Sequence, residues 1–254
     1  SSAEAVNLVY AASLEALLAQ LARAARFELR AAAATALGRI REQAARPALI
    51  AALGDSWGEV RRASLEALQA LGQPPSEEER RASTAIGQEQ WTAVVAVGGP
   101  AVPLCLHALG DPADDARTLH WRSRAAWALG EIGDPAARPA LLDLLAREPH
   151  GAVRQAAARA LGRMADDEVG EALLATFGKA SGDEQLRLAL VEAVGLCEGT
   201  AARTLLARAT SDPSAEVRDA AARAMSQSAN PLVDGLIDAL NNTDPGVRQK
   251  AADE

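Results

Sequence analysis

The chain has 254 residues, of which 49% are hydrophobic and only 3% aromatic, and about a quarter of its positions are alanine. This composition favours close-packed helices over sheets, and no alternating runs of β-branched and aromatic residues predict strands. The net charge of -8 argues against the positive surface that generic nucleic-acid binding requires, so we expect no nucleic-acid partner.

The longest apolar stretch and the two cysteines give expectations about location. Residues 91–109 are interrupted by two glycines and two prolines, so they do not predict a continuous spanning helix, and we expect no membrane association. Cys105 and Cys197 lie 92 residues apart and form no metal-binding motif. Unpaired cysteines are typical of a reducing compartment, which predicts a cytoplasmic protein.

One short pattern recurs along the chain: an apolar residue, an arginine, an alanine-rich stretch, and then Ala-Leu-Gly or a close variant. Its arginines are separated by 31, 61, 32, 33, 31 and 30 residues, which indicates a tandem array of units of about 31 residues with one double-length gap. The marker arginines are Arg30, Arg61, Arg122, Arg154, Arg187, Arg218 and Arg248.

In chain order, residues 3–26 fit one or two starting helices, and each marker segment then forms the second helix of a unit. First helices opened by a proline or a small residue are predicted at 46–55, 102–111, 138–147, 202–212 and 231–240. The double gap at 73–99 holds Pro74-Pro75, a capping box of Ser76 with Glu79, and a short helix at 88–97. The last marker segment, 247–254, stops inside its helix, so we expect a truncated final repeat.

Prolines, glycines and aspartates punctuate these units. The prolines fall in first turns of helices, the glycines fall where a helix C-terminus favours a left-handed residue, and the aspartates stand in turns where they can cap the second helix. They are Pro47, Pro103, Pro139 and Pro231; Gly38, Gly72, Gly130, Gly162 and Gly195; and Asp55, Asp111, Asp212 and Asp244.

The segment GDPAARPALLDLLAREPHGAVRQAAARALG (133–162) and its six weaker copies resemble HEAT repeats, of the short-unit bacterial type called phycobilisome-lyase-like. The resemblance implies an all-α, right-handed α-α superhelix of about seven to eight helical pairs. We expect one solenoid over 1–254, with an aberrant helical insert at 73–99.

In HEAT-like solenoids the second helices line the concave surface, so their outward residues are candidates for binding. Counting from the apolar residue before each marker arginine, helical geometry predicts offsets +3, +4, +7 and +8 in the core and +2, +5, +6 and +9 outside. Trp127 at +6, and Leu188 with Val191 at +2 and +5, are then apolar side chains in outward positions. An aromatic residue beside arginines is typical of binding hot spots. The alternative is that local twist tucks Trp127 against a neighbouring helix.

The partner surface predicted from these positions consists of Trp127, Arg124, Gln155, Arg159, Leu188, Val191, Glu192 and Arg223. The marker arginines are interpreted differently. The resemblance implies that they serve a hydrogen-bond ladder between repeats, with the turn aspartates and nearby carbonyls, and the guanidinium fork suits such contacts. An anion-binding stripe is the alternative.

No catalytic or metal-binding set is visible in the sequence. His107, His120 and His150 have no companion histidine at i+3 or i+4, whereas a metal site needs three or four converging ligands. Deoxyhypusine hydroxylases have an architecture that resembles the one expected here, but they carry His-Glu pairs that hold two irons. In this chain none of the three histidines is followed by a glutamate. We therefore predict no metal and no cofactor; the sequence favours a non-enzymatic role and leaves enzymatic activity as an open alternative.

The sequence predicts a scaffold that binds a partner protein along the concave face of a solenoid. The alternative that the resemblance implies is a phycobilin lyase-like subunit, or a chaperone acting on a tetrapyrrole-binding protein.

Overall fold

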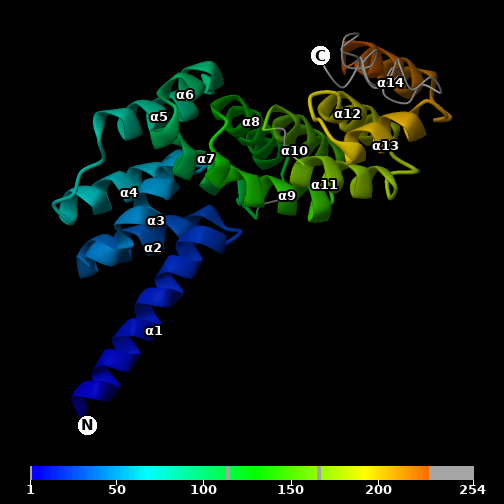
Figure 1. The fold of residues 1–254 in the computed structure, drawn as a ribbon. Helices are drawn as coiled ribbons and strands as arrows, with labels where there is room; N and C mark the ends of the chain where they lie inside the picture. The colour runs from blue at the N-terminus through cyan, green and yellow to red at the C-terminus, as the bar shows by residue number, and fades with distance from the viewer. Residues whose placement is uncertain (1, 113–114, 165–166, 229–254) are drawn as a thin grey trace, which may run out of the picture. The chain divides into compact units, whose positions relative to one another are not determined.

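The computed structural model describes residues 2–112, 115–164 and 167–228 (Figure 1). These ranges hold fourteen α-helices and four short 3₁₀ helices, and no strand occurs in them. The predicted all-α fold of helical pairs is confirmed. The chain divides into two compact units, Ser1–Met164 and Ala165–Glu254, which we call unit 1 and unit 2.

Unit 1 contains ten α-helices and the four 3₁₀ helices in its described part. They are α1 (Ser2–Arg23), α2 (Phe27–Ile40), η1 (Gln43–Ala45), α3 (Arg46–Ala51), η2 (Ala52–Gly54), α4 (Gly58–Ala70), α5 (Glu77–Gly87), α6 (Trp91–Val97), η3 (Gly99–Ala101), α7 (Val102–Leu109), α8 (Ala116–Ile132), η4 (Pro135–Ala137), α9 (Arg138–Arg147) and α10 (Gly151–Arg163). The described part of unit 2 contains α11 (Asp167–Phe177), α12 (Glu184–Val194), α13 (Thr200–Ala209) and α14 (Ala215–Ser228).

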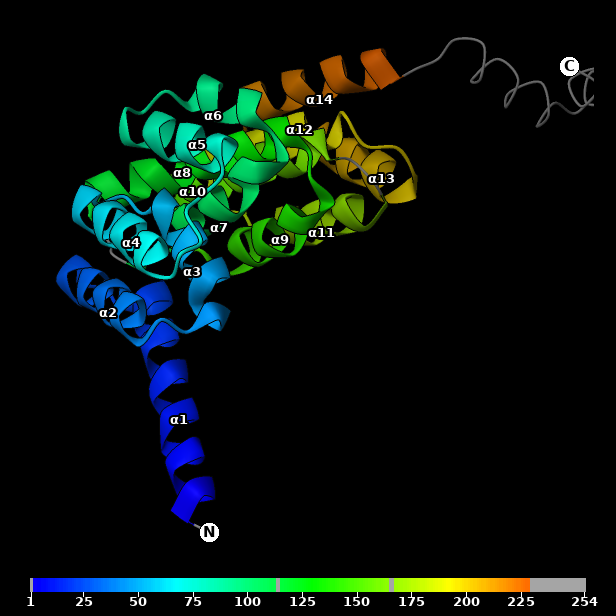
Figure 2. The same cartoon turned by 90° about the vertical axis from the view of Figure 1, so that its left-hand side faces the viewer.

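Within the described residues, the marker segments form the second helix of each pair, as predicted; the helices predicted at 231–240 and 247–254 lie outside these residues. In unit 1, α2 packs beside α4 and α8 packs beside α10 (Figures 1 and 2). In unit 2, α12 packs beside α14 and α11 packs beside α13. Each second helix therefore has two kinds of neighbour, the first helix of its own pair and another second helix.

Helix starts follow the sequence signals. Pro47, Pro103 and Pro139 lie in the first turns of α3, α7 and α9, where a missing N–H leaves no helical hydrogen bond unmade. These positions are confirmed, and Pro231 lies outside the described residues.

The 73–99 segment forms the short helices α5 and α6. The capping box is confirmed: the Glu79 N–H donates to Ser76 Oγ at 3.1 Å, and the Ser76 N–H donates to Glu79 Oε2 at 2.6 Å. The predicted 88–97 helix begins at Trp91 instead, because the chain turns first through Glu89, whose φ is 57°.

The buried face of the second helices is wider than predicted. Ala34, Ala126, Ala158 and Val191, all at offset +5, are completely buried, so the expectation that this offset faces outward was wrong for these four helices. At the same offset Leu65 is half-buried and Ala222 is exposed. The physical reason is that each second helix packs against another second helix as well as against its first helix, which buries more than one stripe.

The glycines that end the marker segments also differ from expectation. Gly38 and Gly130 are not C-terminal caps but lie buried inside α2 and α8. A Cβ on Gly38 would stand 2.7 Å from Ala67 Cα, and one on Gly130 would stand 2.6 Å from Ala160 Cα. Their role is close approach between neighbouring second helices.

The other predicted glycine caps give a mixed result. Gly72, with a φ of 70°, has the left-handed conformation and is confirmed. Gly162 lies inside α10, and Gly195 is right-handed with a φ of -60°. The left-handed caps of α2 and α8 are instead Arg41 and Gly133.

We predict that Gly130→Ala destabilises unit 1 by about 1–3 kcal/mol, because the added methyl group would force α8 and α10 apart. The matched control is Gly110→Ala, since a Cβ there meets its nearest atom at an ordinary 3.6 Å. All four tryptophans lie in unit 1, so urea unfolding followed by tryptophan fluorescence measures this unit. Equal stability of the two variants would contradict the packing role.

Candidate functional site

A buried ion pair joins successive repeats of unit 1. Arg30 Nε lies 2.7 Å from Asp55 Oδ2, and Arg30 Nη2 lies 3.0 Å from Asp55 Oδ1. Arg30 belongs to α2, and Asp55 stands 25 residues later in the turn before α4. Arg30 Nη1 also donates to the Ala24 carbonyl at 2.7 Å. One guanidinium thus links the turn before its own helix to the turn of the next repeat.

Polar groups of a third turn close around this pair. Asp111 Oδ2 accepts from Arg30 Nη2 at 3.0 Å and from Ser56 Oγ at 2.8 Å, and His107 Nε2 lies 3.0 Å from Asp55 Oδ2. Burial raises the pKa of the Asp55 carboxyl, but the hydrogen bonds with His107 and Arg30 outweigh burial and hold that pKa below its ordinary value. The buried charges are therefore compensated by specific partners.

Unit 2 repeats the same ion pair. Arg187 Nε and Nη2 bind the two carboxylate oxygens of Asp212 at 2.8 and 3.0 Å, again across 25 residues. Arg187 Nη1 donates to the Ser181 carbonyl at 2.9 Å. Burial raises the pKa of the Asp212 carboxyl, and the hydrogen bonds from Arg187 and the Ser214 N–H bring it below its ordinary value.

Two further marker arginines make related contacts. Arg122 pairs with Glu148 and donates to the Leu109 carbonyl, and Arg218 Nη1 donates to the Asp212 carbonyl at 2.7 Å. Arg154 is half-buried near the start of α10, and Arg248 lies outside the described residues.

The turn aspartates bind these arginines more than they cap helices. Asp55 Oδ1 accepts the Trp57 N–H and Asp212 Oδ1 accepts the Ser214 N–H, both at 2.9 Å, so each also orders its turn. Asp111 was expected to cap the next helix, but the N-cap of α8 is Asp115, four residues later; α8 begins five residues after Asp111, whereas α4 begins three residues after Asp55. Asp244 lies outside the described residues.

Arg61 departs from the pattern. Its Nη1 donates to the carbonyl six residues earlier, Asp55, at 2.7 Å, as the Nη1 of Arg30 does to Ala24. The residue 25 positions later is Ile86, and no carboxylate of the described residues lies within 4 Å of the Arg61 guanidinium. Its Cζ stands instead 5.9 Å from the centre of the Trp121 ring.

A second arginine shares this location. Arg117 Cζ lies 5.0 Å from the centre of the Trp57 ring and 5.6 Å from that of Trp121. We call Trp57, Trp121, Arg61 and Arg117 the Trp57–Trp121 cluster. The sequence analysis missed it; the one available signal is weak, since Ile86 stands 25 positions after Arg61, where Arg30 and Arg187 have an aspartate, but Arg154 also lacks an acid at that spacing.

The predicted partner surface divides between the two units. In unit 1, Arg124 on α8 and Arg159 on α10 are exposed, while Trp127 and Gln155 on the same two helices are half-buried. In unit 2, Glu192 and Arg223 are exposed and Leu188 is half-buried. The structure brings the unit 1 residues onto two adjacent helices.

Val191 does not belong to that surface. It is 0% exposed, because offset +5 of α12 faces the interior of unit 2, as it faces the interior in α2, α8 and α10. It cannot contact a partner while α12 remains folded.

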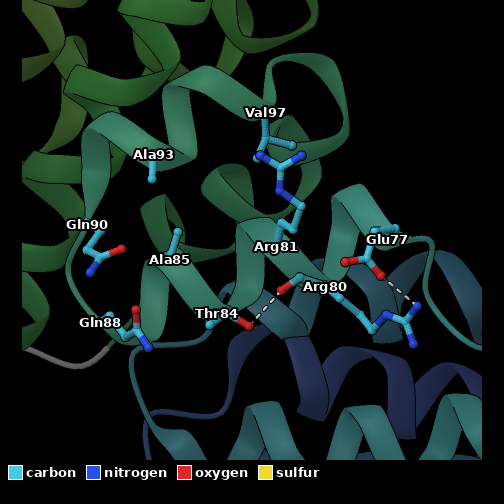
Figure 3. A pocket seen from close by; sticks show the side chains of 9 residues that line it. All are labelled: Glu77, Arg80, Arg81, Thr84, Ala85, Gln88, Gln90, Ala93 and Val97. Carbon is cyan, nitrogen blue, oxygen red and sulfur yellow. Dashed lines mark hydrogen bonds and ion pairs between the residues drawn. The ribbon is translucent and has the colours of Figure 1, made fainter.

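A shallow depression lies between α5 and α6 (Figure 3). It has a volume of about 340 Å³ and is open to solvent. Glu77 and Arg80 pair with each other at 2.8 Å along its edge, and Figure 3 shows the Arg81 side chain extending toward Val97. Its polar side chains come from α5 and from the turn before α6, and Figure 3 shows them spread along the depression.

The described residues show no grouping of three His, Cys, Asp or Glu side chains suited to holding a metal ion. Burial raises the pKa of the Cys105 thiol to about 12, which makes it a poor nucleophile. Within the same residues, no single helix is both long and apolar enough to cross a membrane; the segments Trp91–Val97 and Gly99–Leu109 reach that composition only as a pair bent by 120°.

We predict that Arg30→Ala destabilises unit 1 by about 3–5 kcal/mol, because it leaves the Asp55 carboxylate buried without its main cation. Arg62→Ala is the matched control, since the exposed Arg62 contacts only Glu66, at 4.0 Å, and should change stability by less than about 0.5 kcal/mol. Urea unfolding followed by tryptophan fluorescence measures the loss in unit 1. Labelling of the buried Cys197 measures unit 2, which should not change; a loss of similar size for Arg62→Ala would refute the special role of Arg30.

The lowered pKa of Asp55 also predicts a pH dependence. Ionised Asp55 stabilises the folded state above its ordinary pKa of 3.8, and this contribution disappears as pH falls through the lower pKa of the folded state. The stability difference between the wild type and Asp55→Asn, measured by urea unfolding from pH 7 to pH 2, should therefore be constant above about pH 5 and shrink below pH 4. A difference independent of pH would show that the charge of Asp55 does not matter.

Comparisons with known proteins support the description of the fold as a series of repeated helical pairs. The family model for HEAT repeats matches residues 14–79, 77–162, 113–195 and 178–254. Among solved structures, human deoxyhypusine hydroxylase in complex with glycerol is 24% identical over 79% of this chain and 79% of its own, with a TM-score of 0.42, a likeness too distant to bear on activity. No protein with a curated description matches the sequence. The matched segments span almost the whole sequence, and the chain belongs to the HEAT-repeat family.

Proposed function

We propose that this protein is a scaffold that binds a partner protein through the outward-facing side chains of its second helices. In unit 1 this surface is centred on Trp127 of α8, with Arg124 beside it in sequence and Gln155 and Arg159 on the adjacent helix α10. HEAT repeats present long surfaces of this kind without disturbing their core.

The position of Trp127 is the observation that supports this proposal. The other described residues at offset +6 are exposed, and they are polar or charged: Thr35, Glu66, Arg159, Glu192 and Arg223. Trp127 is the exception, an indole that is half-buried and partly open to solvent. A large aromatic surface that the fold does not fully cover, beside exposed arginines, has the composition of a binding hot spot.

The surface of unit 2 is a second part of the proposal. Leu188 is half-buried, and Glu192 and Arg223 are exposed on α12 and α14. These residues give that surface both charge signs and a small apolar area, which suits a protein partner better than a polyanion.

We predict that Trp127→Ala, and separately Arg159→Glu, reduces recovery of the partner protein at least about tenfold in affinity capture from the native host. The matched control is Arg62→Glu, which reverses the charge of an exposed arginine side chain on α4. Circular dichroism must show the same helicity and melting temperature for all variants. The protein that the wild type captures and the variants do not is then purified, and the Kd of its complex with the wild type and with each variant is measured directly. Recovery of the same proteins by wild type and both variants would refute this surface.

A role as a bilin lyase-like subunit is a separate and more specific hypothesis. It depends only on the resemblance of the repeat to the phycobilisome-lyase-like type, and no residue of the described sites favours a tetrapyrrole. A shift in visible absorbance when a bilin is added would support it.

A further inference from the structure

The Arg61 guanidinium has an unused hydrogen-bonding edge. In Arg30 and Arg187, Nη1 binds the carbonyl six residues earlier while Nε and Nη2 bind an aspartate carboxylate of the next turn. Arg61 makes the first of these contacts and lacks the second. The insertion of α5 and α6 explains this, because it places the apolar Ile86 where the spacing would require an acid.

This edge is not sealed in the core. Arg61 is half-buried, and neither its Nε nor its Nη2 is among the buried nitrogens that lack a hydrogen bond in the described residues. Gly87 packs closely beside this edge, since a Cβ there would stand 2.9 Å from Arg61 Nη2. The two nitrogens are therefore not completely enclosed, and only a residue without a side chain fits next to them.

Arg117 supplies a second positive charge at the same point. Arg117 Nη2 donates to the Ser56 carbonyl at 2.9 Å, and Arg61 Nη1 reaches the same oxygen at 3.2 Å. The two guanidiniums thus converge on one acceptor. No carboxylate of the described part of the chain lies within 4 Å of Arg117 either.

The tryptophan rings hold these arginines in place. Trp121 lies under both guanidiniums, and Trp57 lies under Arg117. Trp57 in turn stacks on Phe27 with ring centres 4.1 Å apart, and Trp91 meets Trp121 edge-on at 5.7 Å. A cation–π contact of this kind does not use the N–H groups as donors to a charged partner.

The local electrostatics favour an added anion. Burial lowers the pKa of the Arg61 guanidinium, and the charge of Arg117 lowers it further, against the opposing effects of Asp55 and Glu59. Asp55 is hydrogen-bonded to Arg30 and His107 and acts on Arg61 through its charge, without a side-chain hydrogen bond to the guanidinium. A negative group placed between the two arginines would relieve their repulsion.

We propose that the Trp57–Trp121 cluster is a binding site for a carboxylate, which the Nε and Nη2 of Arg61 and the guanidinium of Arg117 would hold together. A carboxylate is the expected class because Asp55 and Asp212 occupy the equivalent edge of Arg30 and Arg187 in the same geometry. It can come from a free dicarboxylic acid or from an acidic side chain of a bound polypeptide. This site is distinct from the Trp127 surface and does not depend on it.

The test is titration of the full chain with three probes: succinate, a capped tetraglutamate peptide and inorganic phosphate. Tryptophan fluorescence and calorimetry report binding, since both arginines lie against indole rings. Saturable binding of succinate identifies a free acid as the source, and saturable binding of the peptide alone identifies an acidic polypeptide. Binding should weaken with added salt.

The variants assign any binding to the site. Arg117→Gln should weaken it at least about tenfold, and Arg117 is exposed, so its loss should not unfold the unit. Arg61→Gln should have a similar effect, and Gly87→Asp should block the site with a carboxylate of the chain itself. Arg62→Gln and Trp127→Ala should bind like the wild type, and slow labelling of Cys105 shows that each variant is folded.

The absence of saturable binding by either carboxylate would overturn the proposal. So would binding that survives both Arg117→Gln and Arg61→Gln, or phosphate binding tighter than that of both carboxylates. Loss of partner capture by Trp127→Ala with unchanged succinate binding would separate this site from the proposed scaffold surface.

Discussion

The buried pairing of an arginine with an aspartate of the next turn is the constraint on which the helical stack depends. Desolvating both charges costs several kcal/mol for each ion, and only a closely fitted partner offsets that cost. Arg30 meets this requirement with two nitrogens on Asp55 and a third on the Ala24 carbonyl. Because the Asp55 carboxylate must lie within hydrogen-bonding distance of Arg30, the ion pair fixes the position of one helical pair relative to the next. Arg187 and Asp212 impose the same relation in unit 2.

The insertion of α5 and α6 shows what happens when this relation is broken. The helix bearing Arg61 still packs beside α2, so its guanidinium is held as in the other repeats. The acid 25 residues later is missing, and the guanidiniums of Arg61 and Arg117 lie near the Trp121 ring instead. Within the described residues, the irregular repeat therefore leaves Arg61 without the carboxylate that binds Arg30 and Arg187. In a chain whose net charge is -8, such a location is a specific feature rather than part of a general positive field.

The sequence predicted much of the fold, because the helical pairs depend on local signals. The spacing of the marker arginines, the prolines at helix starts and the Ser76–Glu79 capping box are all visible in the chain itself. It did not predict the burial of Val191 or the packing role of Gly130, since helical periodicity describes one helix and not how many neighbours surround it. The Trp57–Trp121 cluster was also missed, because its members come from segments 60 residues apart that only the fold brings together.

The central claim is that Arg61 is held like the other marker arginines but has an open edge. The most direct measurement is solvent exchange of the arginine Nε–H groups by nuclear magnetic resonance, in the full chain. The account predicts slow exchange for Arg30 and Arg187, whose Nε–H groups bind carboxylates, and fast exchange for Arg61, which becomes slow when a carboxylate binds. Exchange of Arg61 as slow as that of Arg30 in the free protein would contradict the account.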